Sequence, residues 1–340
     1  MTSILREQTN NFSAGRDLDG AGAGEFLDAL IGATNEDSIA AVLRAWDQKG
    51  IAEEEIFSFA RILRDRCIKV ASKHETFADV VGTGGSTAKT FNVSTAAAFV
   101  TAGAGVPVAK HGNRAATSNS GSADVLDELG VEPAVDAATA ERCLNEIGVC
   151  FMFAPNFHRL SPTLGKVRRG LGFPTIFNCV GPLCNPASAP HQVIGVWDES
   201  MVVKMANALA RLGTTRSWVV HGGDGLDEIS LGGTTTVAEV DGRSVYCFEI
   251  EPGDFGLERA NLDDIRAGSS AESAGIIRNV LRGGSSDAAT RIVSMNSAAA
   301  LFISGGSESL RNGIDVAGES IRSGRAAGKL DQLAEMVKTR

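Results

Sequence analysis

Aromatic residues are scarce in this sequence: it has three Trp and one Tyr, and only 6% of its 340 residues are aromatic. A core built mainly from Ala, Val and Leu suits helices packed on a parallel sheet, so the composition favours an α/β protein over a β-sandwich. The length is sufficient for one large domain or for two domains of unequal size.

Positive charge is also in short supply, because 32 Lys and Arg against 41 Asp and Glu give a net charge of −9. Nucleic-acid binding depends on clustered cations that neutralise phosphates, so this balance argues against a nucleic-acid partner. An anionic ligand would have to be held by a local group of cations and hydrogen-bond donors.

The cysteines form no Cys-x-x-Cys pair and have no histidine at the spacing of a zinc site. Most of them lie in apolar stretches, which is typical of reduced thiols in a core. They are Cys67, Cys143, Cys150, Cys179, Cys184 and Cys247. No apolar run reaches the length of a membrane span, and the start MTSILREQTN lacks the apolar region of a secretory signal. We therefore expect a cytoplasmic protein with no membrane partner.

The N-terminal quarter carries a helical pattern without strand signals. Residues 1–23 are polar and glycine-rich, which predicts a loose N-terminal arm. Apolar residues at helical spacing predict three helices in a small all-helical domain over 24–73, with Asp37 capping the second helix. A polar helical stretch within 160–190 interrupts later strands, and we expect part of it to join this helical domain.

From residue 74 onward, short β-branched runs alternate with helices. This alternation is typical of a mostly parallel central sheet flanked by helices, so residues 74–340 are predicted to form a large α/β domain. A stretch of antiparallel character has Asp241-Gly242 at the position of a hairpin turn. Helices return after Leu262.

The first candidate ligand loop follows a predicted strand and leads into a helix. It contains Gly82 and Gly85 and ends with Asn92, Ser94 and Thr95. Glycines let a backbone approach phosphate closely, and a helix N-terminus offers free N–H donors. The loop is not a Walker motif, and an ordinary tight turn is the alternative interpretation.

The second candidate loop follows the next strand. Lys110 and Arg114 supply charge, residues 118–120 supply donors, and a helix begins near Ser122. A mobile surface loop is the alternative. Because two loops after consecutive strands lie at one edge of a sheet, we expect them to hold two phosphate groups together.

An acidic pair and an arginine pair complete the candidate site. Asp227 and Glu228 follow a strand and a glycine-rich loop, where they could coordinate Mg²⁺ that substrate phosphates also hold; a solvated surface pair is the alternative. Arg168 or Arg169 could bind a carboxylate through two parallel hydrogen bonds, and the alternative is a cationic solvent-facing side of a helix.

The histidines form no Ser-His-Asp pattern of a hydrolase. His111 and His158 lie beside the proposed site, and a structural hydrogen bond is the alternative role for each.

Five motifs together resemble the anthranilate phosphoribosyltransferase family, from about Phe26 to the C-terminus. They are GTGG…NVST, KHGNRAATSNSGSADVLDELG, FMFAPNFH, KVRRGLGFPTIFNCVGPLCNP and HGGDGLDEIS. The resemblance implies the fold of the pyrimidine nucleoside phosphorylases, with a small helical domain and a larger α/β domain. It implies transfer of the phosphoribosyl group of 5-phosphoribosyl 1-diphosphate to the amine of anthranilate, in tryptophan biosynthesis. It also implies a pair of Mg²⁺ ions per active site and a homodimer through the helical domain.

The resemblance assigns roles to matching positions. It implies that the donor is bound by Gly82, Gly85, Ser86, Thr90, Asn92, Val93, Ser94, Thr95, Lys110, His111, Gly112, Asn113, Arg114, Ala115, Ala116, Thr117, Ser118 and Ser122. It implies that anthranilate is bound by Gly82, Asn113, Arg168, His111 and His158, with its carboxylate at Arg168. Magnesium is implied at Ser94, Asp227 and Glu228. No general base is implied, and transition-state support is implied for Lys110, Asn92, Asp227 and Glu228.

One departure from the family pattern concerns the first loop. The family usually reads Gly-Thr-Gly-Gly-Asp-Gly, whereas Ser86 and Thr87 stand here in place of Asp and Gly. A carboxylate near the diphosphate and a flexible glycine are thereby lost. A nucleoside phosphorylase of the same fold and a non-catalytic binding module are the two alternative functions.

Overall fold

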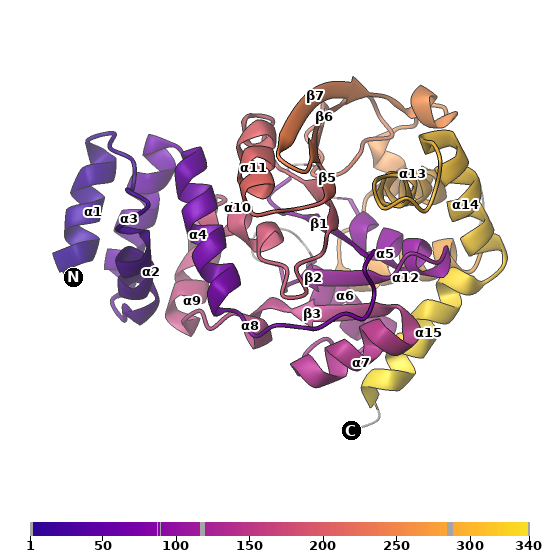
Figure 1. Ribbon diagram of the computed structural model, residues 1–340, viewed down its shortest axis with the longest axis horizontal. Coiled ribbons are helices and arrows are strands. Elements are labelled where there is room, and N and C mark those ends of the chain that lie inside the picture. The colour runs from indigo at the N-terminus through magenta and orange to yellow at the C-terminus, as the bar shows by residue number, and fades with distance from the viewer. Residues whose placement is uncertain (1–2, 87, 89, 116–119, 284–287, 339–340) are drawn as a thin grey trace.

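The computed structural model describes residues 3–86, 88, 90–115, 120–283 and 288–338 (Figure 1). Its strands form one seven-stranded sheet, and helices cover both faces of this sheet. The N-terminal helices form a group at one end of the molecule's long axis. The strands are β1 (Ala78–Gly82), β2 (Val108–Gly112), β3 (Val149–Phe153), β4 (His191–Gly195), β5 (Arg216–Gly222), β6 (Thr235–Asp241) and β7 (Ser244–Ile250).

The helices of the first half are α1 (Ser3–Ser13), α2 (Ala23–Gly32), α3 (Glu36–Lys49), α4 (Glu53–Arg66), α5 (Val93–Gly103), α6 (Ser122–Leu129), α7 (Ala137–Ile147), α8 (Ala154–Phe157) and α9 (Pro162–Leu171). Those of the second half are α10 (Ile176–Leu183), α11 (Ser200–Arg211), α12 (Ser270–Leu281), α13 (Ala288–Ile303), α14 (Leu310–Arg322) and α15 (Arg325–Lys338), with short 3₁₀ helices η1 (Pro252–Phe255) and η2 (Leu262–Ile265).

The sheet has the order β3-β2-β1-β4-β5-β6-β7. The first five of these strands are mutually parallel, and β6 and β7 add an antiparallel hairpin. The prediction of a mostly parallel sheet flanked by helices is therefore confirmed. The hairpin turn falls at Asp241-Gly242 as predicted, where Gly242 adopts the left-handed φ of 58°.

Two hydrophobic cores lie on opposite faces of the sheet, because successive side chains of a strand point to opposite sides. Val80 of β1 and Val193 of β4 face the core beneath α5–α7 and α12–α15. Their neighbours Val81 and Ile194 face the core beneath α1–α4 and α9–α11. Both faces being buried explains why these strands read as continuous apolar runs.

The prediction of a loose N-terminal arm was wrong, because Ser3–Ser13 fold into helix α1. Leu5 and Phe12 are seven residues apart, two turns of helix, and both are 1% exposed. The Phe12 ring stacks on Trp46 of α3 at 4.7 Å between centroids. The segment thus buries enough apolar surface against α3 to be ordered, although its local sequence is polar.

The three predicted N-terminal helices are α2, α3 and α4. The predicted cap of α3 was wrong: the Asn35 side chain, not Asp37, accepts from the Ser38 amide at 2.8 Å. A capping residue must precede the first helical residue. Asp37 lies inside the first turn, where its charge instead complements the helix dipole.

A buried carboxylate fixes the connection from α1 to α2. Glu55 of α4 is 0% exposed and accepts from the Trp46 indole at 2.7 Å and from the amides of Leu18 and Ala52 at 2.8 Å each. Lys49 lies 3.0 Å from the same carboxylate. Glu55 is therefore fully hydrogen-bonded, as a buried charge must be.

The chain returns to the N-terminal helices after β3. Helix α9 packs against α3, and α10 packs against α4. The Arg64 guanidinium of α4 donates to the carbonyl oxygens of Leu183 and Leu212, which end α10 and begin the turn after α11. These contacts join the helical end of the molecule to the sheet; the domain boundaries at residues 24 and 74 stay a prediction.

The described residues contain neither a membrane-spanning helix nor a disulfide. In that part of the chain, no helix combines the length and apolar character needed to cross a bilayer. All six cysteines are free thiols there, five of them buried and Cys247 exposed on β7. Location in the cytoplasm stays a prediction.

Candidate active site

Three loops meet at the carboxyl edge of the sheet. The first (residues 83–92) joins β1 to α5, the second (113–121) joins β2 to α6, and the third (223–234) joins β5 to β6. The chain runs from β1 outward to β2 and β3 and then crosses to β4 on the other side of β1. Ligand sites of parallel sheets form where the strand order reverses in this way.

The acidic pair of the third loop contacts the first loop and the start of α5. Asp227 Oδ2 accepts from the Gly84 amide at 2.8 Å, and Glu228 Oε1 accepts from the Ser94 amide at 3.2 Å. A Cβ atom on Gly82 would lie 2.6 Å from Asp227 Oδ2, so the close approach requires glycine there. Residues 143 positions apart are thus brought together at one point.

The electrostatics of this pair suit a cation. Asp227 and Glu228 are half-buried as whole residues. Desolvation of the Glu228 carboxylate and, to a smaller extent, repulsion from Asp227 raise the pKa of Glu228 to about 8. Burial likewise raises the pKa of Asp227. Desolvation makes two adjacent carboxylates reluctant to ionise, and a bound divalent cation would relieve this.

Lys110 is the basic side chain in contact with this region. Its Nζ donates to the Val80 carbonyl at 2.5 Å and to Ser94 Oγ at 3.4 Å. Burial lowers the Lys110 pKa, while attraction to Asp79 and Glu228 opposes the change. In the described part of the chain, no cluster of three His, Cys, Asp or Glu side chains could hold a metal ion. The pair could therefore hold Mg²⁺ only together with further oxygen ligands, such as substrate phosphates.

Asn92 links the first two loops. Its Oδ1 accepts from Ser120 Oγ at 2.7 Å and from Ser273 Oγ at 2.9 Å, and its Nδ2 donates to the Ser120 carbonyl at 3.4 Å. Ser120 belongs to the second loop, and Ser273 belongs to α12. Nothing in the local sequence marks Ser273, which the sequence analysis missed.

The other residues assigned to the first motif lie in the first loop or in the first turn of α5. Gly85 has a φ of +86°, and Ser86 Oγ donates to the Gly225 carbonyl of the third loop at 2.7 Å. Thr90 pairs with Arg266 in an isolated antiparallel bridge. Val93 and Thr95 are buried in the first turn of α5, and Thr95 Oγ1 has no hydrogen-bond partner among the described residues.

The second loop is organised by an acidic residue of α6. Asp124 Oδ2 accepts from the Ala115 and Gly121 amides at 2.9 Å each. Arg114 pairs with Asp124 and with Asp127, both at 2.8 Å. These acids therefore already neutralise Arg114, which was predicted to contact the donor.

Of six further residues assigned to the phosphoribosyl donor, three have defined positions and three lie outside the described residues. Asn113 Oδ1 accepts from the Arg114 amide at 2.8 Å, and the Asn113 carbonyl accepts from Ser122 Oγ at 3.3 Å. A Cβ atom on Gly112 would collide with Ser122 Oγ and with the Phe151 ring. Ala116, Thr117 and Ser118 lie outside the described residues.

Helix α9 places the two candidate arginines differently. Arg169 is exposed, whereas the Arg168 guanidinium lies 4.9 Å from the centre of the Phe177 ring, and its Nε is buried without a hydrogen-bond partner among the described residues. Burial lowers the pKa of Arg168 to about 10, so it stays charged at pH 7. A guanidinium whose Nε is buried and unpaired is suited to an anionic partner such as a carboxylate.

Two histidines meet between β2 and α8. The rings of His111 and His158 lie 5.1 Å apart, and His111 Nδ1 lies 3.1 Å from the Gly181 carbonyl of α10. Burial lowers the pKa of His111 to about 3 and that of His158 to about 4. Both rings are therefore neutral at pH 7 and, tilted by 59° to one another, they form an uncharged pair instead of a cationic site.

Helix α10 connects these groups to the first loop. Phe177 contacts Arg168, Gly181 contacts His111, and Asn178 Nδ2 donates to the Thr83 carbonyl at 3.1 Å. Helix α10 thus carries both Phe177, which contacts Arg168 of α9, and Asn178, which bonds the first loop.

Comparison with known proteins agrees with this geometry. Residues 74–327 match the family described as "Glycosyl transferase family, a/b domain". The chain is 42% identical over 337 residues to the anthranilate phosphoribosyltransferase of Moorella thermoacetica, covering 99% of both chains. It is 43% identical over 331 residues to that of Natronomonas pharaonis, covering 97% of this chain and 99% of the relative.

Solved structures give the same result. The anthranilate phosphoribosyltransferase of Thermus thermophilus superposes with a TM-score of 0.88 at 36% identity, covering 98% of this chain and 99% of that one. The enzyme of Saccharomyces cerevisiae in complex with PRPP and Mg superposes with a TM-score of 0.90 at 29% identity, covering 100% and 99%. The chain therefore belongs to the anthranilate phosphoribosyltransferase family.

Proposed function

We propose that this chain transfers the 5-phosphoribosyl group of 5-phosphoribosyl 1-diphosphate to the amine of anthranilate, giving N-(5-phosphoribosyl)anthranilate and diphosphate, in tryptophan biosynthesis. The observation that carries the proposal is the contact of Asp227 and Glu228 with the first loop and α5. The named relatives cover nearly the whole chain, and one of them was solved with the donor and Mg.

The three loops bind the phosphoribosyl donor in this proposal. The amide groups at the start of α5 and in the second loop offer N–H donors to phosphate oxygens. Lys110 Nζ contacts Ser94 Oγ, and Asn92 contacts Ser120 of the second loop. The buried hydroxyl of Thr95 has no hydrogen-bond partner among the described residues. We assign these three side chains to donor binding. The other donor residues assigned in the sequence analysis complete this proposed set.

We place Mg²⁺ at Asp227, Glu228 and Ser94, with a pair of ions per site. The two buried carboxylates with raised pKa values fit such an occupant. When bound, magnesium neutralises charge that accumulates on the leaving diphosphate.

We place anthranilate between helix α9 and the loops at the carboxyl edge of the sheet. Arg168 would bind its carboxylate, and Gly82, Asn113, His111 and His158 would line the ring and amine. The S. cerevisiae enzyme has also been solved in complex with 4-fluoroanthranilate. Both histidines are neutral at pH 7, so they would line the proposed ring site without adding charge to it.

The reaction needs no strong base, because an aromatic amine is neutral and nucleophilic near pH 7. The difficult event is cleavage of the bond between the anomeric carbon and the diphosphate, which leaves positive charge on the ribosyl carbon. Lys110 and the fixed amides stabilise the departing negative charge. Arg168 and the loops hold amine and anomeric carbon in line, which removes the entropy of their encounter. Closure of the N-terminal helices and α9 toward the loops of the sheet would exclude water from the reacting groups.

Anthranilate fluorescence tests the function directly. Purified protein with Mg²⁺ and saturating donor should consume anthranilate, and omission of either component should stop the loss of fluorescence. Phosphorolysis of thymidine or uridine without anthranilate turnover would indicate a nucleoside phosphorylase instead. No turnover in either assay would indicate a non-catalytic binding module.

We also propose a homodimer through the N-terminal helices, as in the family the sequence resembles. Ile4 on α1 is 37% exposed and is one of the large apolar side chains left at the surface of this unit. An apolar residue at a symmetric contact would be covered in a dimer.

A further inference from the structure

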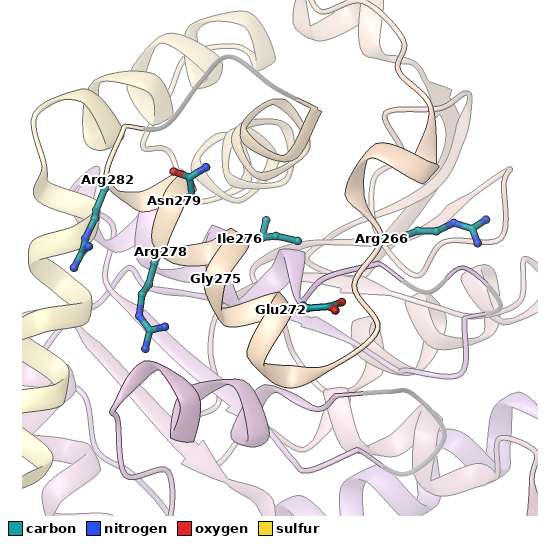
Figure 2. A pocket seen from close by; sticks show the side chains of 7 residues that line it. All are labelled: Arg266, Glu272, Gly275, Ile276, Arg278, Asn279 and Arg282. Atoms are coloured by element: carbon teal, nitrogen blue, oxygen red, sulfur yellow. The ribbon is translucent and has the colours of Figure 1, made fainter.

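Helix α12 has two faces of different character. Its exposed face and Arg266 line a hollow of about 680 Å³ (Figure 2). The residues around this hollow are Arg266, Glu272, Gly275, Ile276, Arg278, Asn279 and Arg282. Arg266 points to one side of the helix and the other two arginines point to the opposite side, so the guanidinium groups do not converge on a ligand (Figure 2). The buried face of α12, in contrast, touches the donor site.

We propose that Ser273 on this buried face is a positioning residue for the donor site, acting through Asn92. The proposal rests on the proposed transferase function. Ser273 is 0% exposed, and its single hydroxyl makes two bonds to one residue. It accepts from the Asn92 amide at 2.9 Å and donates to Asn92 Oδ1, also at 2.9 Å.

These two bonds fix both the backbone and the side chain of Asn92. Its Oδ1 receives the hydroxyls of Ser273 and Ser120, so the carboxamide oxygen faces α12 and the second loop. A hydroxyl that both accepts and donates holds the amide plane more firmly than a single bond. Without Ser273 the N–H of the half-buried Asn92 would lose the acceptor that it has in this structure.

The position of Asn92 determines the position of the magnesium and phosphate ligands beyond it. Asn92 immediately precedes α5, and the Ser94 amide two residues later meets Glu228. The exit of the first loop is also held by the segment that leads into α12, since the Phe91 amide donates to the Ile265 carbonyl at 3.0 Å. Segment 265–273 therefore holds the exit of the loop, as Asp227 holds its entrance at Gly84.

Ser273→Ala removes the hydroxyl and leaves the fold of α12 otherwise unchanged. We expect the KM for the donor to rise about tenfold, the KM for anthranilate to change less than about twofold, and kcat to fall less than the donor KM rises. Ser273→Thr, which keeps the hydroxyl, should restore most of the donor KM.

Ser320→Ala is the matched control. Ser320 is also 0% exposed and donates to the carbonyl of Val100, near the far end of the same helix α5. Ser320→Ala loses one buried hydrogen bond to α5, whereas Ser273→Ala loses the two bonds to Asn92 at its start. Both melting temperatures should therefore fall, and that of Ser273→Ala should fall at least as far. Only Ser273→Ala should weaken donor binding.

Calorimetric titration of the donor with Mg²⁺ measures the same effect without turnover. A tenfold weaker donor Kd in Ser273→Ala, absent in Ser320→Ala, would support the proposal even if anthranilate were not the acceptor. An unchanged donor Kd in folded Ser273→Ala, or an equal loss in both variants, would overturn it. Wild-type protein that binds the donor but does not consume anthranilate would overturn the proposed function and leave the calorimetric comparison valid.

Discussion

At the scale of single residues, the protonation of Glu228 connects the buried site to pH. Its pKa is about 8 in the free protein, because burial disfavours the carboxylate and Asp227 repels it. Below that pH the free protein holds a proton that a cation has to displace. Asp79, whose pKa burial raises to about 6, titrates in a lower range.

We predict that the apparent affinity for Mg²⁺ rises as pH increases from 7 and levels off above about 8.5. The sign follows from the raised pKa: ionisation of Glu228 is incomplete below pH 8, and only the ionised form coordinates the ion. Magnesium titrations of activity at fixed saturating donor, repeated across this pH range, check the expectation.

Glu228→Gln supplies the control for that prediction. The variant cannot ionise at this position, so its residual magnesium dependence should be weak and flat between pH 7 and 9. An equally steep pH dependence in the variant would assign the titration to another group.

Arg168 and Arg169 form a matched pair for testing carboxylate recognition. Only Arg168 is packed inward, with its Nε unpaired and its guanidinium over Phe177. We predict that Arg168→Ala raises the KM for anthranilate about 10- to 100-fold, the value of a lost charged hydrogen-bond pair, with a much smaller effect on the donor KM. Arg169→Ala should leave both constants within about twofold. Equal changes of the two constants in Arg168→Ala would remove the carboxylate role.

At the scale of elements, helix α1 shows how a polar segment becomes part of a core. Phe12 is 1% exposed, stacks on Trp46 and meets Phe26 edge-on at 5.9 Å. These contacts lie at the end of the molecule that also holds α9 and Arg168.

We predict that Phe12→Ala lowers the free energy of unfolding by about 3–5 kcal/mol, because it deletes a fully buried ring and leaves a cavity. Ile4→Ala on the same helix removes a side chain that is 37% exposed and should cost within about 0.5 kcal/mol in the monomer. Urea unfolding of the two variants checks the difference. A loss of less than about 1 kcal/mol for Phe12→Ala would show that α1 is not part of the cooperative core.

At the scale of the whole molecule, the sheet separates two cores and the site lies at one edge of it. The first loop, Asp227 and Lys110 belong to the sheet, while Arg168 arrives on α9 from the helical end. Arg64 and the packing of α10 on α4 join the two parts. Small relative movements of these parts would therefore change the distance between the proposed donor and acceptor sites.

We predict that light scattering of the purified protein gives twice the 35.4 kDa mass of the chain. A charged substitution at an exposed apolar position of the helical unit, Ile4→Glu, should shift the mass toward that of the monomer. A monomeric wild-type protein at micromolar concentration would contradict the proposed dimer.

The sequence by itself determined the features that depend on local periodicity and turn chemistry. Runs such as those of β1 and β4 specify buried parallel strands, and glycines after them specify loops at the same sheet edge. The family motifs lie in these loops, so the identity of the family was within reach of the sequence alone. Most of the predicted helices follow for the same reason, since a period of 3.6 is visible in a short window.

Only the tertiary structure decided the features that depend on contacts between distant segments. Local polarity concealed the burial of Phe12, and helical periodicity did not distinguish the inward Arg168 from Arg169, although the family resemblance selected Arg168. The raised pKa of Glu228 requires burial that no stretch of sequence displays. Ser273 meets Asn92 across 181 positions, so its role exists only once α12 has packed beside α5. Desolvation and long-range hydrogen bonds are properties of the packed chain, and for that physical reason they could not be predicted from the order of its residues.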